Sequence, residues 1–540
     1  MLPVAITYAE DVIQTASLVG GPSDDEALTG AAIQSDGTIV LAGNLGPLRG
    51  DGYRNAKERA LGRLDGDISA AVLLVSGDGK QLLAITRLPG RIHDLALDGS
   101  DAIYLAAGDA GLIKLSPSAG KVIWSDTGSG PCTRVDAAIT DADSDVAAFF
   151  GTEESTGNVL VKSSGGKTLG SFKGHQKTKD LAIDPRSRRV FLTGFKNDRG
   201  NGTPGSKWAN GAPVQVAYLL ARDYGGSQIW KAYDWPGKQV GYIDGGLSSM
   251  ADTRGLRVTL GQDGKLYAAF MAAGGDHIFR YDGLDFGSKA RVVGGDKFSE
   301  FYNSASEHKG LYGQFDPGTG KALAIQQFTA RLDSGKANTA WSDQGAIAAD
   351  EQGRIYATGK SASGLPLSWD PWQGGAYTGG GFLVIWSPGF ADRLACVRLG
   401  TSGELHAVAV RKIRGRSTPT VVFAGHVLGK GEAPQVFVRD GLQDKAVSPG
   451  EAVFGVIGPR VAAGELKADG DAPSDDADAA APPAAGSDNP HEVKARANLE
   501  AAQRLLERGD EARARDLLRR LIRQWPDTPA AAEARGLLGE

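Results

Sequence analysis

The chain has 540 residues, a formal net charge of −5, 76 glycines and only three methionines. So long a chain exceeds what one hydrophobic core usually organises, so we expect several domains or one large repeat architecture. The glycine-rich composition favours many short strands joined by tight turns, and no stretch clusters Lys and Arg with interleaved aromatic residues, which argues against a nucleic-acid partner.

The N-terminal segment lacks the features of a signal peptide. Residues 1–11 have no basic region, and their apolar run is too short. If the protein is exported, its signal peptide is therefore absent from the chain as given. No apolar run approaches the roughly 18 residues that a transmembrane helix needs, so the sequence predicts no membrane span.

One pattern recurs from residue 31 onwards: an apolar stretch, an Asp/Gly turn, a second apolar stretch and a terminal Gly. Residues 31–43 set the template, residues 94–108 repeat it, and a degenerate copy at 256–270 has Phe270 in place of Gly. The other copies end at Gly151, Gly194, Gly359 and Gly425. Seven units result, and their shortest spacing, 43 residues from position 108 to position 151, matches the period of roughly 40–50 residues of propeller blades.

A second hairpin follows the first in several copies. Residues 71–85, 111–124 and 218–230 each have the pattern of a strand, a glycine-containing turn and a strand. Two hairpins make a four-stranded antiparallel blade, which buries both faces only by stacking against neighbours around an axis. The sequence therefore predicts an all-β fold, a seven-bladed β-propeller of four-stranded antiparallel blades over residues 1–458, followed by a small C-terminal α-helical segment.

The two ends of the predicted propeller should meet. Residues 11–20 have the pattern of the last strand of a blade rather than the first. We therefore expect the N-terminal strand to complete the blade that begins near Leu405, although residues 452–457 compete for the same position. The ring of blades should close near residue 458.

Two stretches carry the repeat in its fullest form. Residues 20–43 begin with Gly-Gly-Pro-Ser-Asp-Asp, and residues 345–359 continue through Leu365, Pro366 and the glycine-rich stretch 379–400. In these features the chain resembles the bacterial seven-bladed β-propeller repeat (SBBP) family, over most of the predicted propeller. The resemblance implies a propeller fold and an exported protein, periplasmic, on the cell surface or secreted. It implies no reaction, because propellers host many unrelated functions.

One loop has the composition of a binding surface. Trp369, Trp372 and Tyr377 lie in a glycine-rich stretch. Exposed aromatic residues on loops over a rigid scaffold gain contact area at low entropic cost when they bind sugars or proteins. The same stretch also fits the leucine-proline insertion that belongs to the repeat itself, so both interpretations stay open.

A second candidate is an insertion that departs from the repeat. It contains Phe301, Tyr302 and His308 together with carboxylates. Nothing in this segment fixes a nucleophile, a base and an orienting group, so it predicts ligand or partner binding and no mechanism.

Other reactive residue types give no metal or cofactor site. Cys132 and Cys396 lie far apart in no C-x-x-C pattern, which excludes a cysteine-based zinc or iron–sulfur centre and leaves either one disulfide or two buried thiols. The histidines show no metal-binding spacing, although His93 and His406 fall near the starts of innermost strands, where side chains approach the axis. The sequence therefore predicts no catalytic residue, no metal ligand and no cofactor.

Two tryptophans occupy matching positions at the ends of second hairpins. The stretches that end at Trp124 and Trp230 resemble the tryptophan docking motifs of quinoprotein-type propellers, in which the rings pack between blades. The paired adjacent cysteines and the calcium ligands of a quinone enzyme do not accompany them. The resemblance therefore implies a structural role for both rings.

The composition changes abruptly at the end of the predicted propeller. Residues 459–490 are rich in Ala, Asp, Pro and Gly and should form a disordered acidic linker. Residues 491–540 have helical apolar spacing with breaks at Gly509 and at the Trp-Pro-Asp-Thr-Pro step of 525–529. This segment resembles about one and a half tetratricopeptide repeats of the bacterial cell-envelope type. Because stacked repeats usually need about three units, we expect it to bind a protein partner or self-associate, with an autonomous three-helix unit as the alternative.

Two functions remain after these exclusions. The first is a noncatalytic binding or scaffolding protein of the bacterial envelope or exterior, whose propeller loops bind a protein or polysaccharide and whose helical tail recruits a partner. The second is a propeller hydrolase or lyase with a site at the central channel. Two or more carboxylates or histidines that converge within hydrogen-bond reach at the axis would favour the second.

Overall fold

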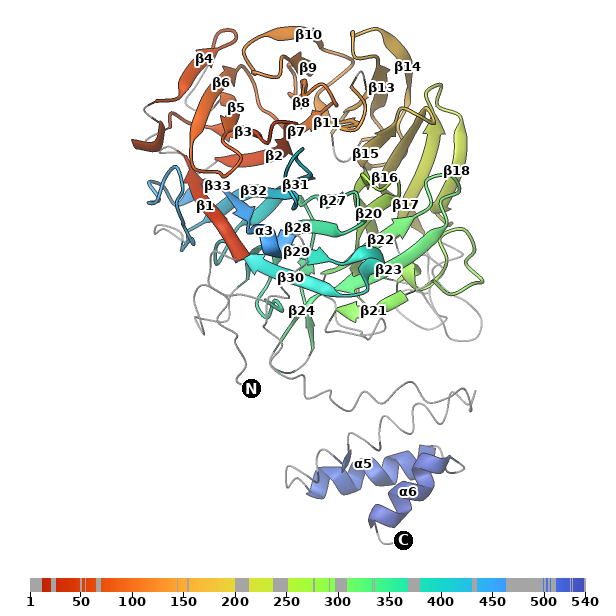
Figure 1. Cartoon of the computed structure of the whole chain (residues 1–540). Coiled ribbons are helices and arrows are strands. Elements are labelled where there is room, and N and C mark those ends of the chain that lie inside the picture. The colour runs from red at the N-terminus through yellow and green to blue at the C-terminus, as the bar shows by residue number, and fades with distance from the viewer. Residues whose placement is uncertain are drawn as a thin grey trace. The chain divides into compact units, whose positions relative to one another are not determined.

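The computed structural model describes residues 12–462 and 499–538 apart from gaps, of which the longest cover 200–212, 237–250, 297–307 and 368–378. The chain divides into two compact units, Met1–Gly470 and Asp471–Glu540. The first unit is built of short antiparallel strands arranged around a central axis (Figure 1).

Three successive four-stranded antiparallel sheets have the same order in space as along the chain. The first holds β7 (Asp94–Leu97), β8 (Ile103–Ala106), β9 (Leu112–Leu115) and β10 (Val122–Asp126). The second holds β11 (Cys132–Ala137), β12 (Val146–Phe150), β13 (Asn158–Lys162) and β14 (Thr168–Lys173). The third holds β15 (Thr178–Asp184), β16 (Arg189–Arg199), β17 (Pro213–Asp223) and β18 (Gln228–Tyr233). The first strand of each lies nearest the centre in Figure 1.

Two further regions vary this plan. One sheet holds β2 (Ala27–Ile33), β3 (Ile39–Leu45), β5 (Ser69–Val75) and β6 (Leu82–Leu88), with β4 (Lys57–Ala60) added parallel to β6. A ten-stranded sheet contains two four-stranded runs. The first run is β19 (Thr253–Leu260), β20 (Leu266–Ala273), β22 (His308–Phe315) and β23 (Ala322–Phe328), with β21 (Val292–Asp296) beside β23. The second run is β27 (Ile347–Ala349), β28 (Ile355–Ser361), β29 (Gly380–Trp386) and β30 (Arg393–Arg398), joined to the first through β26 (Ala340–Trp341).

Minor elements complete the first unit. They are the 3-10 turns η1 (Asp51–Tyr53), η2 (Ile278–Arg280) and η3 (Pro388–Phe390), and the two-stranded ribbon of β24 (Ala330–Arg331) and β25 (Ala337–Asn338). The prediction of an all-β, propeller-like fold with repeated four-stranded antiparallel sheets is thus confirmed.

The two ends of the first unit meet in one sheet, as the sequence predicts. This sheet holds β31 (Glu404–Arg411), β32 (Thr420–Leu428), β33 (Gly450–Ile457) and the N-terminal β1 (Ile13–Val19). β1 pairs antiparallel with β33, so residues 452–457 take the third position and do not displace it.

The packed chain continues past the predicted boundary at 458. The short helix α3 (Pro459–Ala462) buries Val461 and Ala462 fully against this sheet. Residues 459–462 therefore belong to the first unit rather than to the linker, because their apolar side chains find a core to enter.

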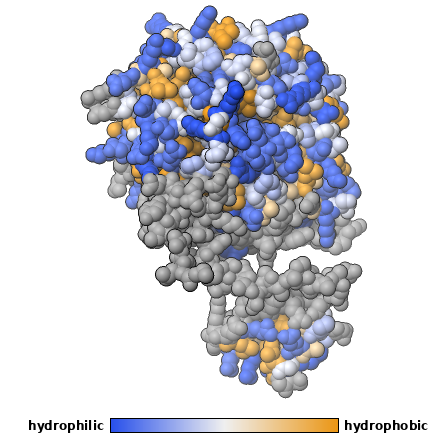
Figure 2. Space-filling model, in the orientation of Figure 1, coloured by the Kyte–Doolittle hydropathy of each residue, from blue (hydrophilic) through white to orange (hydrophobic). Residues whose placement is uncertain are grey.

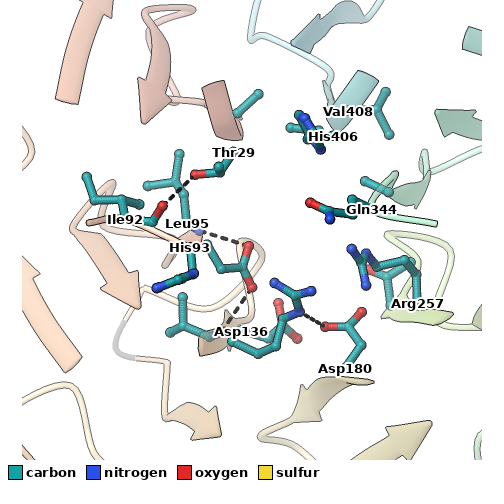
Figure 3. A pocket seen from close by; sticks show the side chains of 18 of the residues that line it. Thr29, Ile92, His93, Leu95, Asp136, Asp180, Arg257, Gln344, His406 and Val408 are labelled. Carbon is teal, nitrogen blue, oxygen red and sulfur yellow. Dashed lines mark hydrogen bonds and ion pairs between the residues drawn. The ribbon is translucent and has the colours of Figure 1, made fainter. Parts of the chain in front are cut away.

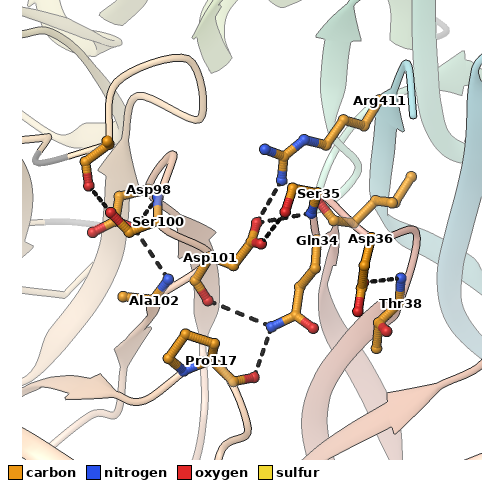
Figure 4. Close-up of polar contacts among 12 residues, drawn as sticks. Gln34, Ser35, Asp36, Thr38, Asp98, Ser100, Asp101, Ala102, Pro117 and Arg411 are labelled. Carbon is orange, nitrogen blue, oxygen red and sulfur yellow. Dashed lines mark hydrogen bonds and ion pairs between the residues drawn. The ribbon is translucent and has the colours of Figure 1, made fainter. Parts of the chain in front are cut away.

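A group of hydrogen bonds connects three neighbouring sheets of the first unit (Figure 4). The Asp101 carboxylate accepts hydrogen bonds from the Ser35 backbone N–H (2.9 Å) and from Arg411 Nη1 (2.8 Å). Arg411 Nη1 also donates to the Ile33 carbonyl (2.9 Å). The sheets that begin with β2, β7 and β31 are therefore tied together by one turn carboxylate.

The recurring Asp of the repeat has a physical cause. The Tyr104 hydroxyl donates to Asp98 Oδ2, and the Tyr356 hydroxyl donates to Asp350 Oδ2, both at 3.0 Å. The same carboxylates accept backbone N–H groups of their own turns, as Asp98 does from Ser100. The Asp and the aromatic residue six positions later thus fix the hairpin turn together.

At the outer rim, a side chain of one sheet donates to a hairpin turn of the next. Indole Nε1 of Trp230 donates to the Pro317 carbonyl (2.9 Å), and that of Trp124 donates to the Ser164 carbonyl (3.0 Å). The same relation recurs in Arg59 Nη1 to the Ser118 carbonyl (3.2 Å) and Thr15 Oγ1 to the Asp78 carbonyl (2.6 Å). The expected structural role of the two tryptophans between sheets is confirmed.

Burial follows the sheet faces. Cys132 and Cys396 are both buried thiols and form no disulfide, so the two-thiol alternative holds. Over the described part of the face in Figure 2, apolar and polar residues are interspersed. In the portion of the chain that the structure describes, no helix has the length and apolar character needed to cross a bilayer.

The second unit contains the helices α5 (Glu511–Gln524) and α6 (Pro529–Leu538). Their shared core consists of Leu499, Ala502, Leu518, Leu521, Ala530, Ala531 and Ala534. The Thr528 hydroxyl accepts the Ala531 N–H (3.3 Å) at the start of α6, where Pro529 fits the first helical position.

Candidate functional site

The first strands of the sheets enclose a cavity of about 340 Å³, called the central cavity below (Figure 3). These strands contact one another in succession: β2 with β7, β7 with β11, β11 with β15, β15 with β19, β19 with β27, β27 with β31, and β31 with β2. Every one of these strands, or the residue directly before it, contributes to the lining.

Most of the charged side chains of the central cavity lie at one end. Charged and polar side chains gather where the first strands begin, as in Arg91, His93 and Gln344. Towards the hairpin turns it continues into a narrower space of about 170 Å³, lined mainly by Ala, Ile, Leu and Val. A charged ligand therefore has most of its partners at the end where the strands begin.

Repeated β-bulges set which residues line the polar end. The pairing of the first and second strands shifts register at Thr29, Thr133, Lys179, Leu256 and His406. A bulge bends its strand and re-aims the side chains beside it. The residues directly after these bulges all line the central cavity: Gly30, Arg134, Asp180, Arg257 and Ala407.

One residue from each first strand, or from the position directly before it, lines the polar end at the same level, and charge is distributed unevenly around this layer of seven residues. Asp94, Arg134, Asp180 and Arg257 follow one another on β7, β11, β15 and β19, and we call them the charged arc. The remaining positions are Gly30, Ala346 and Ala407 on or beside β2, β27 and β31, which we call the small-residue arc. Arg134 Nε lies 3.7 Å from Asp180 Oδ1, so opposite charges alternate along the charged arc.

The carboxylates at this end bind the backbone of the next sheet. Asp94 Oδ2 accepts the Val135 N–H (3.1 Å), and Asp180 Oδ2 accepts the Val258 N–H (2.9 Å). Deeper in the cavity, Asp136 Oδ2 accepts the Ile183 N–H (2.8 Å). Each of these carboxylates thus holds two neighbouring sheets together while it lines the cavity.

Burial raises the pKa values of these carboxyl groups. The pKa of Asp94 rises to about 6, against the opposing effect of the Arg134 guanidinium, and the pKa of Asp136 rises to about 8. Burial also raises the pKa of Asp180, which the Arg257 and Arg134 guanidiniums oppose. Both Asp94 and Asp136 remain partly exposed, yet protein encloses them on most sides. Near pH 7, therefore, Asp94 is mostly ionised and Asp136 is mostly protonated.

A histidine pair borders the same end. His406 Nε2 lies 2.6 Å from His426 Nδ1, and the two rings are nearly parallel at 19°. Burial lowers the pKa of His406 to about 3 and that of His426 to about 4, so both rings are neutral near pH 7. Of these two histidines, only His406 lines the cavity.

An ionic cluster lies beside this pair. Lys360 Nζ contacts Asp343 Oδ2 (2.6 Å) and Glu404 Oε2 (3.3 Å). Glu404 Oε1 accepts the Gln344 backbone N–H (2.7 Å), which fixes the chain where Gln344 borders the cavity. The cluster therefore positions the cavity mouth between β27 and β31.

The expected candidates have different outcomes. His93 and His406 line the central cavity, which confirms that they approach the axis. His308 does not line it: its ring packs at 4.4 Å, centroid to centroid, on Trp341, and the Lys360 ammonium lies 5.3 Å from that indole ring. The five other predicted binding residues, Trp369, Trp372, Tyr377, Phe301 and Tyr302, lie outside the described residues.

The sequence did not single out the charged arc. Arg134 and Asp180 each stand two positions after the start of their strand, whereas Arg257 stands four positions after the start of β19, so no common local spacing marks the three residues. Among the described residues, no group of three or more His, Cys, Asp or Glu side chains could hold a metal ion.

Comparisons with known proteins give no family. No family model matches the chain, and no curated protein matches it. A solved structure, described as that of U3-55K, aligns with a TM-score of 0.43 and 10% identity over 82% of this chain and 98% of its own.

Proposed function

We propose that the protein is a noncatalytic binding protein whose ligand, or a protruding group of a protein or polysaccharide ligand, occupies the polar end of the central cavity. The observation that carries this proposal is the charged arc, in which four successive strands place alternating charges at one end of a cavity of about 340 Å³. This volume falls at the lower end of the range of about 300–1,000 Å³ for small-molecule sites. The carboxylates of the arc also accept hydrogen bonds from the neighbouring sheets, which hold them in place. Such fixed groups suit ligand binding better than proton transfer.

The proposal includes a seven-bladed ring of the SBBP type and an exported location. Seven first strands contact one another in a cycle, and the N-terminal strand pairs in the sheet that ends the first unit, which supports seven blades. Within this scheme the C-terminal helices act as a tetratricopeptide-like segment that recruits a protein partner or self-associates. The small core of α5 and α6 supports a folded recruitment unit.

The test compares wild-type protein with Ala407→Trp, which adds a large side chain at a buried position that lines the central cavity, and circular dichroism checks that the variant folds. Both are applied to glycan and peptide arrays, with Asp440→Asn at the exposed rim as the matched control. Binding should be lost in Ala407→Trp and kept in Asp440→Asn. Equal binding by all three proteins would place the ligand elsewhere and overturn the proposal.

A hydrolase or lyase at the central cavity is the second candidate. The observation that favours it is the pair His406 and His426, whose nitrogens lie 2.6 Å apart, because His406 lines the same cavity as Asp136, a carboxyl group that is protonated near pH 7. If it is right, the captured polysaccharide should be cleaved, with new reducing ends or unsaturated products, and His406→Asn should abolish cleavage. If the ligand stays intact after prolonged incubation, the hydrolase or lyase candidate is excluded and the binding function stands.

A further inference from the structure

The two ends of the charged arc carry opposite charge. The arc begins with the Asp94 carboxylate on β7 and ends with the Arg257 guanidinium on β19. Two strands separate them along the arc, and three separate them along the small-residue arc. Asp94 and Arg257 therefore stand almost opposite each other across the central cavity.

Three of the positions that border the space between these ends carry small residues. Gly30, Ala346 and Ala407 line the remaining positions of the layer. Figure 3 shows Arg257, Gln344 and His406 on one side of the open space and His93 on the other. The hydrogen-bond donors Arg257 and Gln344 are thus grouped opposite the strand that carries Asp94.

We propose that the central cavity binds a compact zwitterion, such as an amino acid or dipeptide, with its ammonium group at Asp94 and its carboxylate at Arg257. This inference rests on the proposed binding function and names the chemical class of its ligand. Arg257 Nε donates to the Gly345 carbonyl (2.5 Å) and Arg257 Nη1 donates to the Leu256 carbonyl (2.7 Å), so the guanidinium is held in a fixed position at the cavity. A ligand carboxylate would gain a charge-assisted contact with this fixed guanidinium, and a charge-assisted bond to an ionised carboxylate suits an ammonium group.

Charge balance favours a zwitterion over a simple anion or cation. The inner members of the arc, Arg134 and Asp180, each have an opposite charge on both sides, so the arc as a whole is close to neutral. Arg91 also lines the polar end, but its side chain is exposed, so solvent screens its charge. A ligand with a net charge would leave that charge buried in the cavity, which costs free energy unless it is paired. A ligand with one charge of each sign adds no net charge and complements both ends.

The experiment uses isothermal titration calorimetry of the full chain with glycine, glycylglycine and a series of ω-amino acids of increasing length. Each probe is paired with its N-acetyl derivative, which lacks the ammonium group, and with its amide, which lacks the carboxylate. At least one zwitterion should bind about tenfold or more tightly than both of its derivatives, because each removes one charge-assisted contact.

Two variants locate the contacts. Asp94→Asn should weaken binding of the zwitterion about tenfold and leave the affinity of the N-acetyl derivative unchanged. Arg257→Gln should also weaken binding of the zwitterion about tenfold and leave the affinity of the amide unchanged. Asp440→Asn is the matched control, and circular dichroism checks folding. The comparison of derivatives on wild-type protein keeps the test valid if either variant fails to fold.

Each outcome separates the two proposals. If derivatives bind as tightly as their zwitterions and Ala407→Trp removes that binding, the zwitterion proposal is wrong and the cavity remains the binding site. If a zwitterion binds best but Asp94→Asn and Arg257→Gln, both folded, leave its affinity unchanged, the assignment to these two residues is wrong. If no probe binds wild-type protein, the zwitterion proposal is overturned, and the array test decides the binding function alone.

Discussion

The charged arc and the small-residue arc line one cavity from equivalent positions, yet they join neighbouring sheets in different ways. On the small-residue side, a Cβ at Gly30 would lie 2.4 Å from the Cβ of Leu95, so β2 and β7 approach too closely for a side chain there. On the charged side, Asp94 and Asp180 reach the backbone of the next sheet with hydrogen bonds of 3.1 and 2.9 Å.

This difference shows that one repeat geometry tolerates two solutions to the same packing problem. Close approach of small residues leaves empty volume at the axis, whereas side-chain-to-backbone bonds leave charge there. The cavity has both volume and charge because the two solutions are segregated on opposite sides. The following changes would break or sharpen that comparison.

The largest effect is expected at the middle of the charged arc. Asp180→Ala removes the carboxylate between two guanidinium groups and should lower the free energy of unfolding by about 3–5 kcal/mol. Urea denaturation measures it, with Ala346→Ser on the small-residue arc as the control, for which a change within about 0.5 kcal/mol is expected. Similar losses for both variants would show that the two arcs do not differ in this way.

Close approach on the other side is tested at Gly30. Gly30→Ala should cost about 1–3 kcal/mol, because the new methyl group meets Leu95 in a packed contact between β2 and β7. Gly165→Ala is the matched control, since the nearest atom to a Cβ there is Ser163 Oγ at 3.9 Å. A Gly30→Ala protein as stable as Gly165→Ala would contradict the assigned packing.

The pH dependence of stability tests the buried carboxyl groups. The pKa of Asp136 is about 8 in the folded protein and 3.8 as its ordinary value, so the folded state holds a proton that the unfolded state releases between these pH values. Stability should therefore fall as pH rises from about 4 to about 8. Asp136→Asn keeps an acceptor for the Ile183 N–H without the charge, so it should flatten this slope and gain about 1–2 kcal/mol at pH 8.

Thermal and urea unfolding across this pH range provide the measurement. Asp94, whose pKa is about 6, should leave a residual slope of the same sign below pH 6 in the Asp136→Asn variant. An unchanged slope in that variant would show that Asp136 does not take up the proton.

The smallest effect is expected at the outer rim of the sheets that carry the charged arc. Trp230→Phe removes the indole N–H donated to the Pro317 carbonyl and should cost about 1 kcal/mol. Trp124→Phe loses an equivalent bond but at a more exposed site, so its urea midpoint should shift less. A loss for Trp230→Phe as large as that for Asp180→Ala would mean that the rim, rather than the axis, holds these sheets together.

Local patterns in the sequence predicted the elements of the fold. Alternating apolar residues around an Asp/Gly turn marked the hairpins. The turn carboxylates of Asp98 and Asp350 accept hydrogen bonds within their own hairpins, so all the residues that form the turn lie close together in the sequence. The same local reading placed His93 and His406 near the axis. It also paired the N-terminal strand with the last sheet, because β1 has the pattern of a final strand.

The sequence by itself determined the strands, their hairpins and the meeting of the two chain ends, because each depends on the spacing of a few neighbouring residues. Only the tertiary structure decided that Asp94, Arg134, Asp180 and Arg257 share one layer, since 40 to 77 residues separate successive members. Their common level depends on bulges that no residue type specifies and on the stacking of sheets around an axis. For the same reason the pairing of His406 with His426 and the burial of Val461 required the folded chain: both arise from contacts between strands, not within them.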